Sequence, residues 1–184
     1  MENRNHKDSL FIDLFCKDKE GKQNFISLYN ALHNTNLDLA TTTVQEVNID
    51  NVLYMALSND IAMLVDNRLV VLVEHQSTIN ENMPLRLLEY VSRIYEQLVP
   101  SEDRYEKKMI KIPYPEFFVF YNGTEDYPVE TELRLSDAFI FPEEKYNVQN
   151  NKFSVEITVK IVNINTDKNS PILKQCKKLE EYSL

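Results

Sequence analysis

The strongest constraint on the fold is a pair of apolar, strand-like runs separated by a short polar segment. The first run covers residues 60–65 and the second covers residues 69–76, and Asp66-Asn67-Arg68 lies between them with side chains typical of turns. The second run is apolar on both faces, which is typical of a strand covered on both sides. We therefore predict a β-hairpin whose second strand lies inside a sheet.

Helical and strand-like patterns flank this hairpin. Apolar residues at helical spacing predict helices over 8–16, 23–33, 81–98 and 171–182, with a charged turn at 17–22 between the first two. Further strand-like runs lie at 41–47, 116–121 and 152–163. This order predicts one α/β domain over residues 1–184, with a mixed central sheet flanked by helices.

Composition excludes several kinds of functional site. The chain has only two glycines, Gly21 and Gly123, which is too few for the glycine-rich loops that bind nucleotides. Because the hairpin turn has no glycine, we expect Asn67 to adopt any left-handed conformation that the turn requires. Two cysteines and three histidines do not make a disulfide framework or a typical zinc site.

Charge and hydropathy bear on partners and location. The net charge of −9 argues against a general polyanion binder but leaves room for a local basic site. The polar N-terminus has no apolar targeting region, and no apolar run approaches the ~20 residues needed to cross a bilayer. We therefore expect a cytoplasmic protein that does not contact membranes.

Two carboxylates mark the open end of the hairpin. If the loop has three residues, Asp60 stands opposite Glu74, and Gln76 shares the face of Glu74 because side chains alternate along a strand. If the loop has two residues, Asp60 instead stands opposite Val73, and the two carboxylates point to opposite faces. The expected site therefore depends on the length of this loop.

Two opposed carboxylates at the end of an apolar hairpin destabilise it unless a positive charge compensates them. A divalent cation would do so, and oxygen ligands favour Mg²⁺ or Mn²⁺ over zinc. The alternative is a pair of solvated acids at strand ends, and spacing alone does not choose between the two.

Short motifs extend over most of the chain, to about Asn165: His6-Lys-Asp-Ser-Leu-Phe11, Leu28-Tyr-Asn-Ala-Leu32, Asn59-Asp60, Val73-Glu-His-Gln-Ser77, Met83-Pro-Leu-Arg86 with Tyr90, Ile112-Pro-Tyr-Pro115 and Tyr121-Asn-Gly123. Together they resemble the recombination-promoting nuclease family, a transposase-like branch of the PD-(D/E)xK nuclease superfamily. The resemblance implies a restriction-endonuclease-like core and an endonuclease that hydrolyses DNA phosphodiesters with Mg²⁺ or Mn²⁺, in recombination or mobile-element biology.

The resemblance also implies roles for individual residues. Asp60 and Glu74 would be catalytic metal ligands, and His75 would add its backbone carbonyl. Gln76 stands where the superfamily has lysine, and Asn59 stands where it has proline. Because glutamine carries no positive charge, Gln76 would orient a water molecule or a phosphate oxygen by hydrogen bonding.

One face of the predicted helix 81–98 carries Arg86, Tyr90, Arg93 and Gln97. Arg86 would neutralise phosphate charge and Tyr90 would donate a hydrogen bond to the substrate, whereas we expect Arg93 and Gln97 to face solvent. Asn30, on the helix 23–33, is a further candidate for substrate binding.

Three questions stay open at this stage. The missing lysine at Gln76, the absence of a glutamate from helix 23–33 and the acidic charge would also suit a degenerate nuclease fold that binds DNA or protein. A basic cluster (Arg104, Lys107, Lys108 and Lys111) is either a contact for the DNA backbone or an exposed loop. The chain is either complete or lacks a C-terminal extension, and such an extension would supply basic surface or a homodimer contact.

Overall fold

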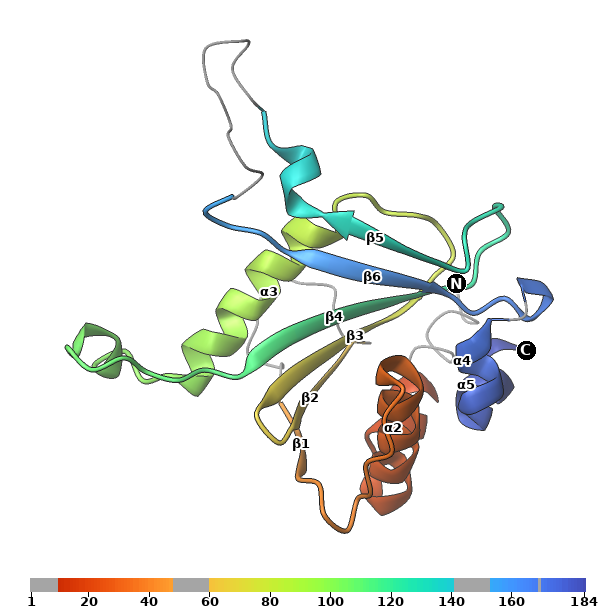
Figure 1. The fold of residues 1–184 in the computed structure, drawn as a ribbon, viewed down its shortest axis with the longest axis horizontal. Helices are drawn as coiled ribbons and strands as arrows, with labels where there is room; N and C mark the ends of the chain where they lie inside the picture. The colour runs from red at the N-terminus through yellow and green to blue at the C-terminus, as the bar shows by residue number, and fades with distance from the viewer. Residues whose placement is uncertain (1–9, 48–59, 141–152, 169) are drawn as a thin grey trace.

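The computed structural model describes residues 10–47, 60–140, 153–168 and 170–184, with the side chains of 73–76 outside the description. A six-stranded sheet of order β1-β2-β3-β4-β6-β5 forms its centre (Figure 1). The strands are β1 (Val44–Glu46), β2 (Ile61–Val65), β3 (Arg68–Gln76), β4 (Tyr114–Tyr121), β5 (Glu130–Arg134) and β6 (Thr158–Asn163). The pairs β3/β4 and β4/β6 are parallel and the other three are antiparallel. The predicted mixed sheet flanked by helices is confirmed.

Helices cover both faces of the sheet. They are α2 (Asp18–His33), α3 (Met83–Leu98), α4 (Pro171–Gln175) and α5 (Lys177–Ser183), and a helical turn at 10–15 precedes α2. One core lies between the sheet and α2, α4 and α5, and a second lies between the sheet and α3. No helix in the described part of the chain has the length and apolar character that a bilayer crossing requires.

The predicted charged turn at 17–22 is wrong, because α2 already begins at Asp18. The Asp18 carboxylate accepts hydrogen bonds from the backbone N–H groups of Glu20 and Gly21, which the first turn of a helix leaves without partners. Gly21 is buried in this turn, where a Cβ atom would lie 2.9 Å from the carbonyl carbon of Cys16. Gly21 therefore allows the first turn of α2 to lie close to the backbone of Cys16, and it does not end a helix.

The hairpin register differs from the expected one. Val65 pairs with Arg68 and Ile61 pairs with Leu72, so the loop has two residues. Asp66, not Asn67, has a positive φ of 52°, and its carboxylate accepts a hydrogen bond from the backbone of Thr43. Two-residue hairpin loops match the twist of their strands when the first loop residue has a positive φ.

Continued by one residue, this register places Asp60 opposite Val73 rather than opposite Glu74. The expected cross-strand pairing of Asp60 with Glu74 is therefore wrong.

Other boundaries moved for local reasons. Strand β5 was not predicted, because its sequence has one strongly apolar residue, Leu133, and its burial alternates along an edge of the sheet. The predicted helix 171–182 is two short helices, because the chain is extended at Cys176.

A cluster of polar side chains ties α2 to the sheet. The Glu116 carboxylate on β4 lies 3.2 Å from Nε2 of His33 and accepts a hydrogen bond of 3.0 Å from Arg68. The other ring nitrogen of His33 lies 2.9 Å from the carbonyl oxygen of Tyr29, and the two rings stack. Both His33 and Glu116 are mostly buried, so their contacts replace lost hydration.

We expect Glu116→Gln to lower the free energy of unfolding by about 1–3 kcal/mol, because it weakens two contacts to mostly buried or charged partners. Urea denaturation measures this change. The control is Glu132→Gln, whose pair with Arg134 is exposed and which we expect to cost less than about 0.5 kcal/mol. Equal losses in the two variants would show that the cluster does not stabilise the fold.

Candidate active site

The site is built on the face of the sheet that α3 covers. Asp60 directly precedes β2, and Tyr90 lies in α3 with 1% of its surface exposed. Burial, followed by the negative charge of Asp60, raises the pKa of the Tyr90 hydroxyl. Tyr90 therefore keeps its proton and can donate a hydrogen bond near the Asp60 carboxylate.

The Tyr90 hydroxyl oxygen is buried, and no hydrogen-bond partner for it occurs among the described residues. A buried hydroxyl without a partner costs about 1–3 kcal/mol. Such groups are uncommon in folded proteins, and they call for an explanation such as a bound ion, water or ligand. A buried hydroxyl that is subject to the charge of a carboxylate is consistent with a site that binds an ion, a water molecule or a phosphate oxygen.

An irregularity in β3 lies beside Asp60. In the β3/β4 ladder Val73 pairs with Val119, but Gln76 pairs with Tyr121, so β3 contains one extra residue between these two pairs. An extra residue reverses the alternation of faces beyond it. With a two-residue loop and a regular β3, the position of Gln76 would lie on the opposite face of the sheet from Asp60. The extra residue returns it to the face of Asp60.

The structure does not describe the side chains of Glu74, His75 and Gln76, so it does not test the roles predicted for these residues. Among these three residues, the strand register gives a backbone partner only for Gln76, which pairs with Tyr121. No cluster of three or more metal-ligating side chains occurs in the described ranges. The metal site consequently stays a prediction.

The turn after β4 packs against the chain that follows β3. A Cβ atom on Gly123 would collide with the backbone oxygen of Ser77 and with the hydroxyl of Tyr121. That hydroxyl accepts a hydrogen bond from the Glu125 backbone N–H and donates one to its carbonyl. The absence of a Cβ atom at Gly123 thus allows the ends of β3 and β4 to lie close together. The motif Tyr121-Asn-Gly123 alone did not predict this role.

The face of α3 divides as expected. Arg86, one turn before Tyr90, is half-buried, and its guanidinium lies 3.3 Å from the sulfur of Met83. Arg93 pairs with Glu96 in an exposed ion pair, and Gln97 is exposed. The expectation that Arg93 and Gln97 face solvent is confirmed.

The structure does not bring Asn30 to this site. Asn30 lies on α2, which covers the opposite face of the sheet from α3. Its amide donates to the carbonyl of Leu37 and accepts from Leu37 N–H and the Thr35 hydroxyl. Asn30 therefore holds the loop after α2, where its side-chain oxygen accepts two hydrogen bonds and its amide nitrogen donates one.

One family model matches most of the chain. The family described as "Putative transposase, YhgA-like" matches residues 5–169. The chain belongs to this family. The match spans every segment that carries the nuclease-like motifs, and the mixed six-stranded sheet with helices on both faces agrees with a restriction-endonuclease-like core. No curated protein and no solved structure matches the chain. Family membership thus associates the chain with transposase- and nuclease-like proteins.

Proposed function

We propose that this member of the transposase-like family is a metal-dependent endonuclease that hydrolyses DNA phosphodiesters. The observation that carries the proposal is the buried hydroxyl of Tyr90, which lies near the charge of Asp60 and has no partner in the described part of the chain. A transposase-like family supplies the substrate class, because such proteins act on DNA.

Each residue of the proposed site has one task. Asp60 and Glu74 would hold Mg²⁺ or Mn²⁺ through carboxylate oxygens, with the backbone carbonyl of His75 as a further oxygen ligand. When bound, the ion supplies Lewis-acid polarisation of the phosphodiester and lowers the pKa of a water molecule. The one-residue irregularity between Val73 and Gln76 supports this arrangement, because it returns the register position of Gln76, opposite Tyr121, to the face of the sheet on which Asp60 lies.

The remaining residues act on the phosphate. The Tyr90 hydroxyl, which keeps its proton, donates a hydrogen bond to a phosphate oxygen or to the attacking water. Gln76 orients the same groups through its amide, which cannot offset charge. Arg86, half-buried one turn from Tyr90, supplies the positive charge that Gln76 lacks and stabilises the charge that develops on the phosphate.

Tyr90→Phe separates a catalytic role from a structural one. Because the hydroxyl is buried without a partner in the described chain, we expect its removal to leave stability unchanged or to raise it by about 1 kcal/mol. Plasmid-nicking activity should fall about 10- to 100-fold, because a donor to the phosphate is lost.

The matched control is Tyr121→Phe, an equally buried tyrosine on the same face whose hydroxyl has both of its hydrogen bonds. We expect this variant to lose about 1 kcal/mol in urea denaturation. If both variants lose the same stability, the Tyr90 hydroxyl has a hydrogen-bond partner in the fold. If Tyr90→Phe keeps full activity, Tyr90 has no role in the reaction.

The direct test of the function is relaxation of a supercoiled plasmid in Mg²⁺ or Mn²⁺, with a chelator as the negative condition. A degenerate nuclease fold that only binds DNA is the second candidate, and the glutamine at position 76 favours it. Metal titration distinguishes the two: an intact site raises the melting temperature with Mg²⁺ concentration, whereas a degenerate site does not. Absence of both relaxation and a thermal shift would overturn the proposed nuclease.

A further inference from the structure

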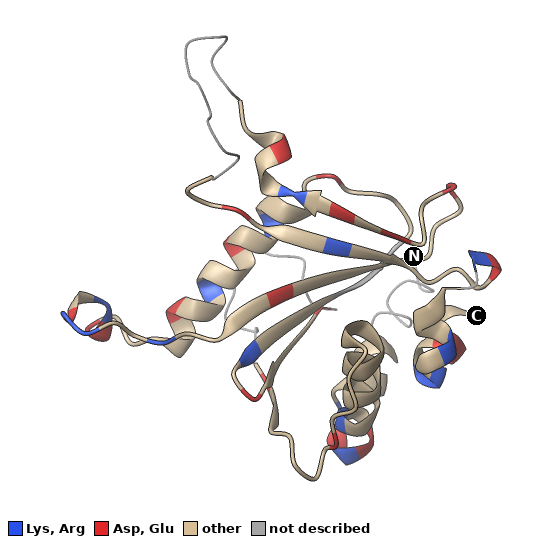
Figure 2. Ribbon diagram, viewed as in Figure 1, with Lys and Arg blue, Asp and Glu red and all other residues tan. Residues whose placement is uncertain are grey.

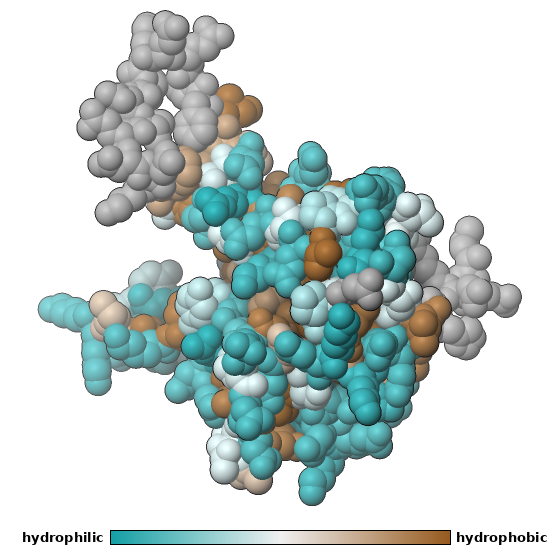
Figure 3. All heavy atoms as spheres, turned by 45° about the vertical axis from the view of Figure 1, so that its right-hand side comes forward, coloured by the Kyte–Doolittle hydropathy of each residue, from teal (hydrophilic) through white to brown (hydrophobic). Residues whose placement is uncertain are grey.

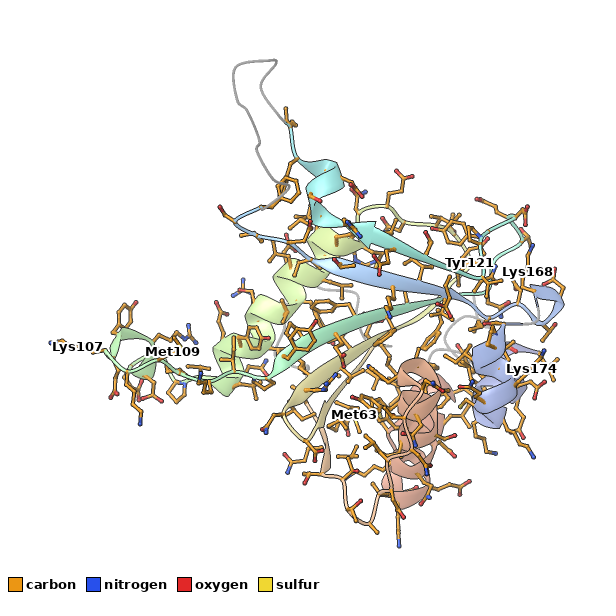
Figure 4. All side chains as sticks on the ribbon, viewed as in Figure 1. Met63, Lys107, Met109, Tyr121, Lys168 and Lys174 are labelled. Carbon is orange, nitrogen blue, oxygen red and sulfur yellow. The ribbon has the colours of Figure 1, made fainter. Side chains whose placement is uncertain are left out.

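Residues 100–113, which we call the arm, connect α3 to β4 and project from the body of the protein (Figures 1 and 3). The arm contains the short 3₁₀ helix η1 (Asp103–Tyr105). It leaves from the start of β4, whereas Tyr121 and the candidate site lie at the other end of that strand (Figure 4). Lys107 and Met109 lie far out on the arm in the same view.

The base of the arm is fixed to α3. One guanidinium nitrogen of Arg104 donates 2.9 Å hydrogen bonds to the carbonyls of Glu96 and Val99, at the C-terminal end of α3. The hydroxyl of Tyr95 donates a 2.7 Å hydrogen bond to the carbonyl of Pro113. Arg104, one of the four basic residues of the sequence cluster, is therefore used to hold the arm in place.

The three lysines of the cluster have a different environment. Lys107, Lys108 and Lys111 are exposed, and none forms an ion pair with an acid in the described ranges. Several surface lysines elsewhere do pair with carboxylates (Lys17 with Asp13, Lys168 with Asp126, and Lys178 with Glu181). Residues 107–114 contain three lysines and no acid in a chain of net charge −9. Figure 2 shows both basic and acidic positions on the arm, and its acids, Glu102, Asp103 and Glu106, all precede Lys107.

Apolar side chains accompany these lysines on the arm surface. Tyr105 is 90% exposed and Met109 is 76% exposed. Ile112 and, directly after the arm, Tyr114 at the start of β4 are also exposed. Scattered apolar side chains on a protein surface need no explanation, but several together on one projecting segment mark a contact surface. Aromatic side chains among cations occur on surfaces that bind nucleic acid.

We propose that the arm is a second DNA-contacting surface, in which Lys107, Lys108 and Lys111 bind backbone phosphates outside the site of cleavage. The inference rests on the proposed function for its substrate. The stretch from Lys107 to Lys111 spans at most about 13 Å of chain, a length over which one DNA strand presents about four phosphates. A fixed base and unpaired cations favour DNA over an acidic protein partner, because phosphate contacts need charge and little shape complementarity. The arm then supplies affinity, and the residues near Asp60 supply chemistry.

The test is fluorescence anisotropy with a labelled 30-base-pair duplex, measured without divalent metal so that no cleavage occurs. The variant replaces Lys107, Lys108 and Lys111 by alanine, and the control replaces three exposed lysines elsewhere (Lys19, Lys174 and Lys177). We expect the arm variant to bind at least about tenfold more weakly at low salt. Its plot of log affinity against log salt concentration should be shallower by about 2.7, for three lost phosphate contacts.

Several outcomes would overturn the arm proposal. Equal binding by the arm and control variants would show that the arm makes no specific contribution. Loss of dimers in light scattering, without loss of DNA affinity, would show that the arm joins two copies of the chain instead. Failure of the arm proposal and failure of the proposed nuclease activity give different results. If the arm lysines contribute to DNA binding but the protein never relaxes plasmid, the arm proposal holds and the nuclease activity is rejected.

Discussion

Asp60→Asn is expected to reduce Mg²⁺-dependent plasmid relaxation by about three orders of magnitude or more while leaving the protein folded. Asparagine keeps the shape of the side chain but removes the negative charge that would hold the cation. The loss corresponds to several kcal/mol of transition-state stabilisation, which is the contribution expected of a catalytic metal. Initial rates of nicking, measured at saturating Mg²⁺ and over a range of enzyme concentrations, give the change directly.

The same substitution has a second, independent readout. Because the charge of Asp60 contributes to the raised pKa of Tyr90, the phenolic pKa should fall when that charge is removed, although burial keeps it above its ordinary value. Nuclear magnetic resonance of ring-labelled tyrosine follows this ionisation, with Tyr90→Phe used to assign the Tyr90 signal among the ten tyrosines.

The control is Glu46→Gln, which removes one exposed carboxylate from the neighbouring strand β1. It should retain activity within about twofold, a change of less than about 0.5 kcal/mol in the barrier. If the two variants nick plasmid at the same rate, Asp60 is not part of an active site.

Gly123→Ala is expected to lower the stability of the fold and to damage the site at the same time. The added Cβ would collide with the backbone oxygen of Ser77, which is not the far end of a flexible side chain, and with the Tyr121 hydroxyl. Forcing an atom into such a contact costs about 1–3 kcal/mol through shifted backbone. The shift would separate the ends of β3 and β4, where Gln76 pairs with Tyr121, and we expect activity to fall further than stability.

Chemical denaturation and plasmid nicking on the same preparation measure both effects. Thr124→Ala, at the exposed position next to Gly123, is the control and should change stability by less than about 0.5 kcal/mol. A Gly123→Ala protein with wild-type stability and activity would show that the two strand ends need not approach each other as closely as the structure places them.

The sequence was sufficient to predict the main elements of the fold. The apolar runs at 60–65 and 69–76 became β2 and β3, and the amphipathic pattern at 81–98 became α3. Strong periodicity identifies an element because burial of its apolar face decides its structure. Strand β5 lacks such a pattern, since it is a half-exposed edge strand, and it was missed for this reason.

The site was harder to predict because it depends on single-residue differences in register. Only a three-residue hairpin loop places Asp60 opposite Glu74, and the left-handed conformation of Asp66 closes the loop in two. The extra residue in β3 between Val73 and Gln76 has no signature such as a glycine in the sequence. Each of these features exchanges the faces of a strand, so no count of residues between Asp60 and Glu74 could establish their relative orientation.

Burial and long-range contacts were also beyond the sequence. The spacing of α3 placed Arg86 and Tyr90 on one face, but only the structure shows that the Tyr90 hydroxyl is buried near Asp60. Asn30 lies within a family-like motif, and its amide holds the local loop at 35–37 instead of facing α3. A motif thus identifies residues that belong together in sequence, whereas topology decides which of them share a face of the sheet.

The most direct test of the central claim is a crystal structure of the protein grown with Mn²⁺, with diffraction recorded near the manganese absorption edge. The account predicts an anomalous peak bound by carboxylate oxygens of both Asp60 and Glu74, on the face of the sheet that carries Tyr90. It would be contradicted by the absence of such a peak in an ordered site, with the Asp60 and Glu74 side chains directed to opposite faces of the sheet.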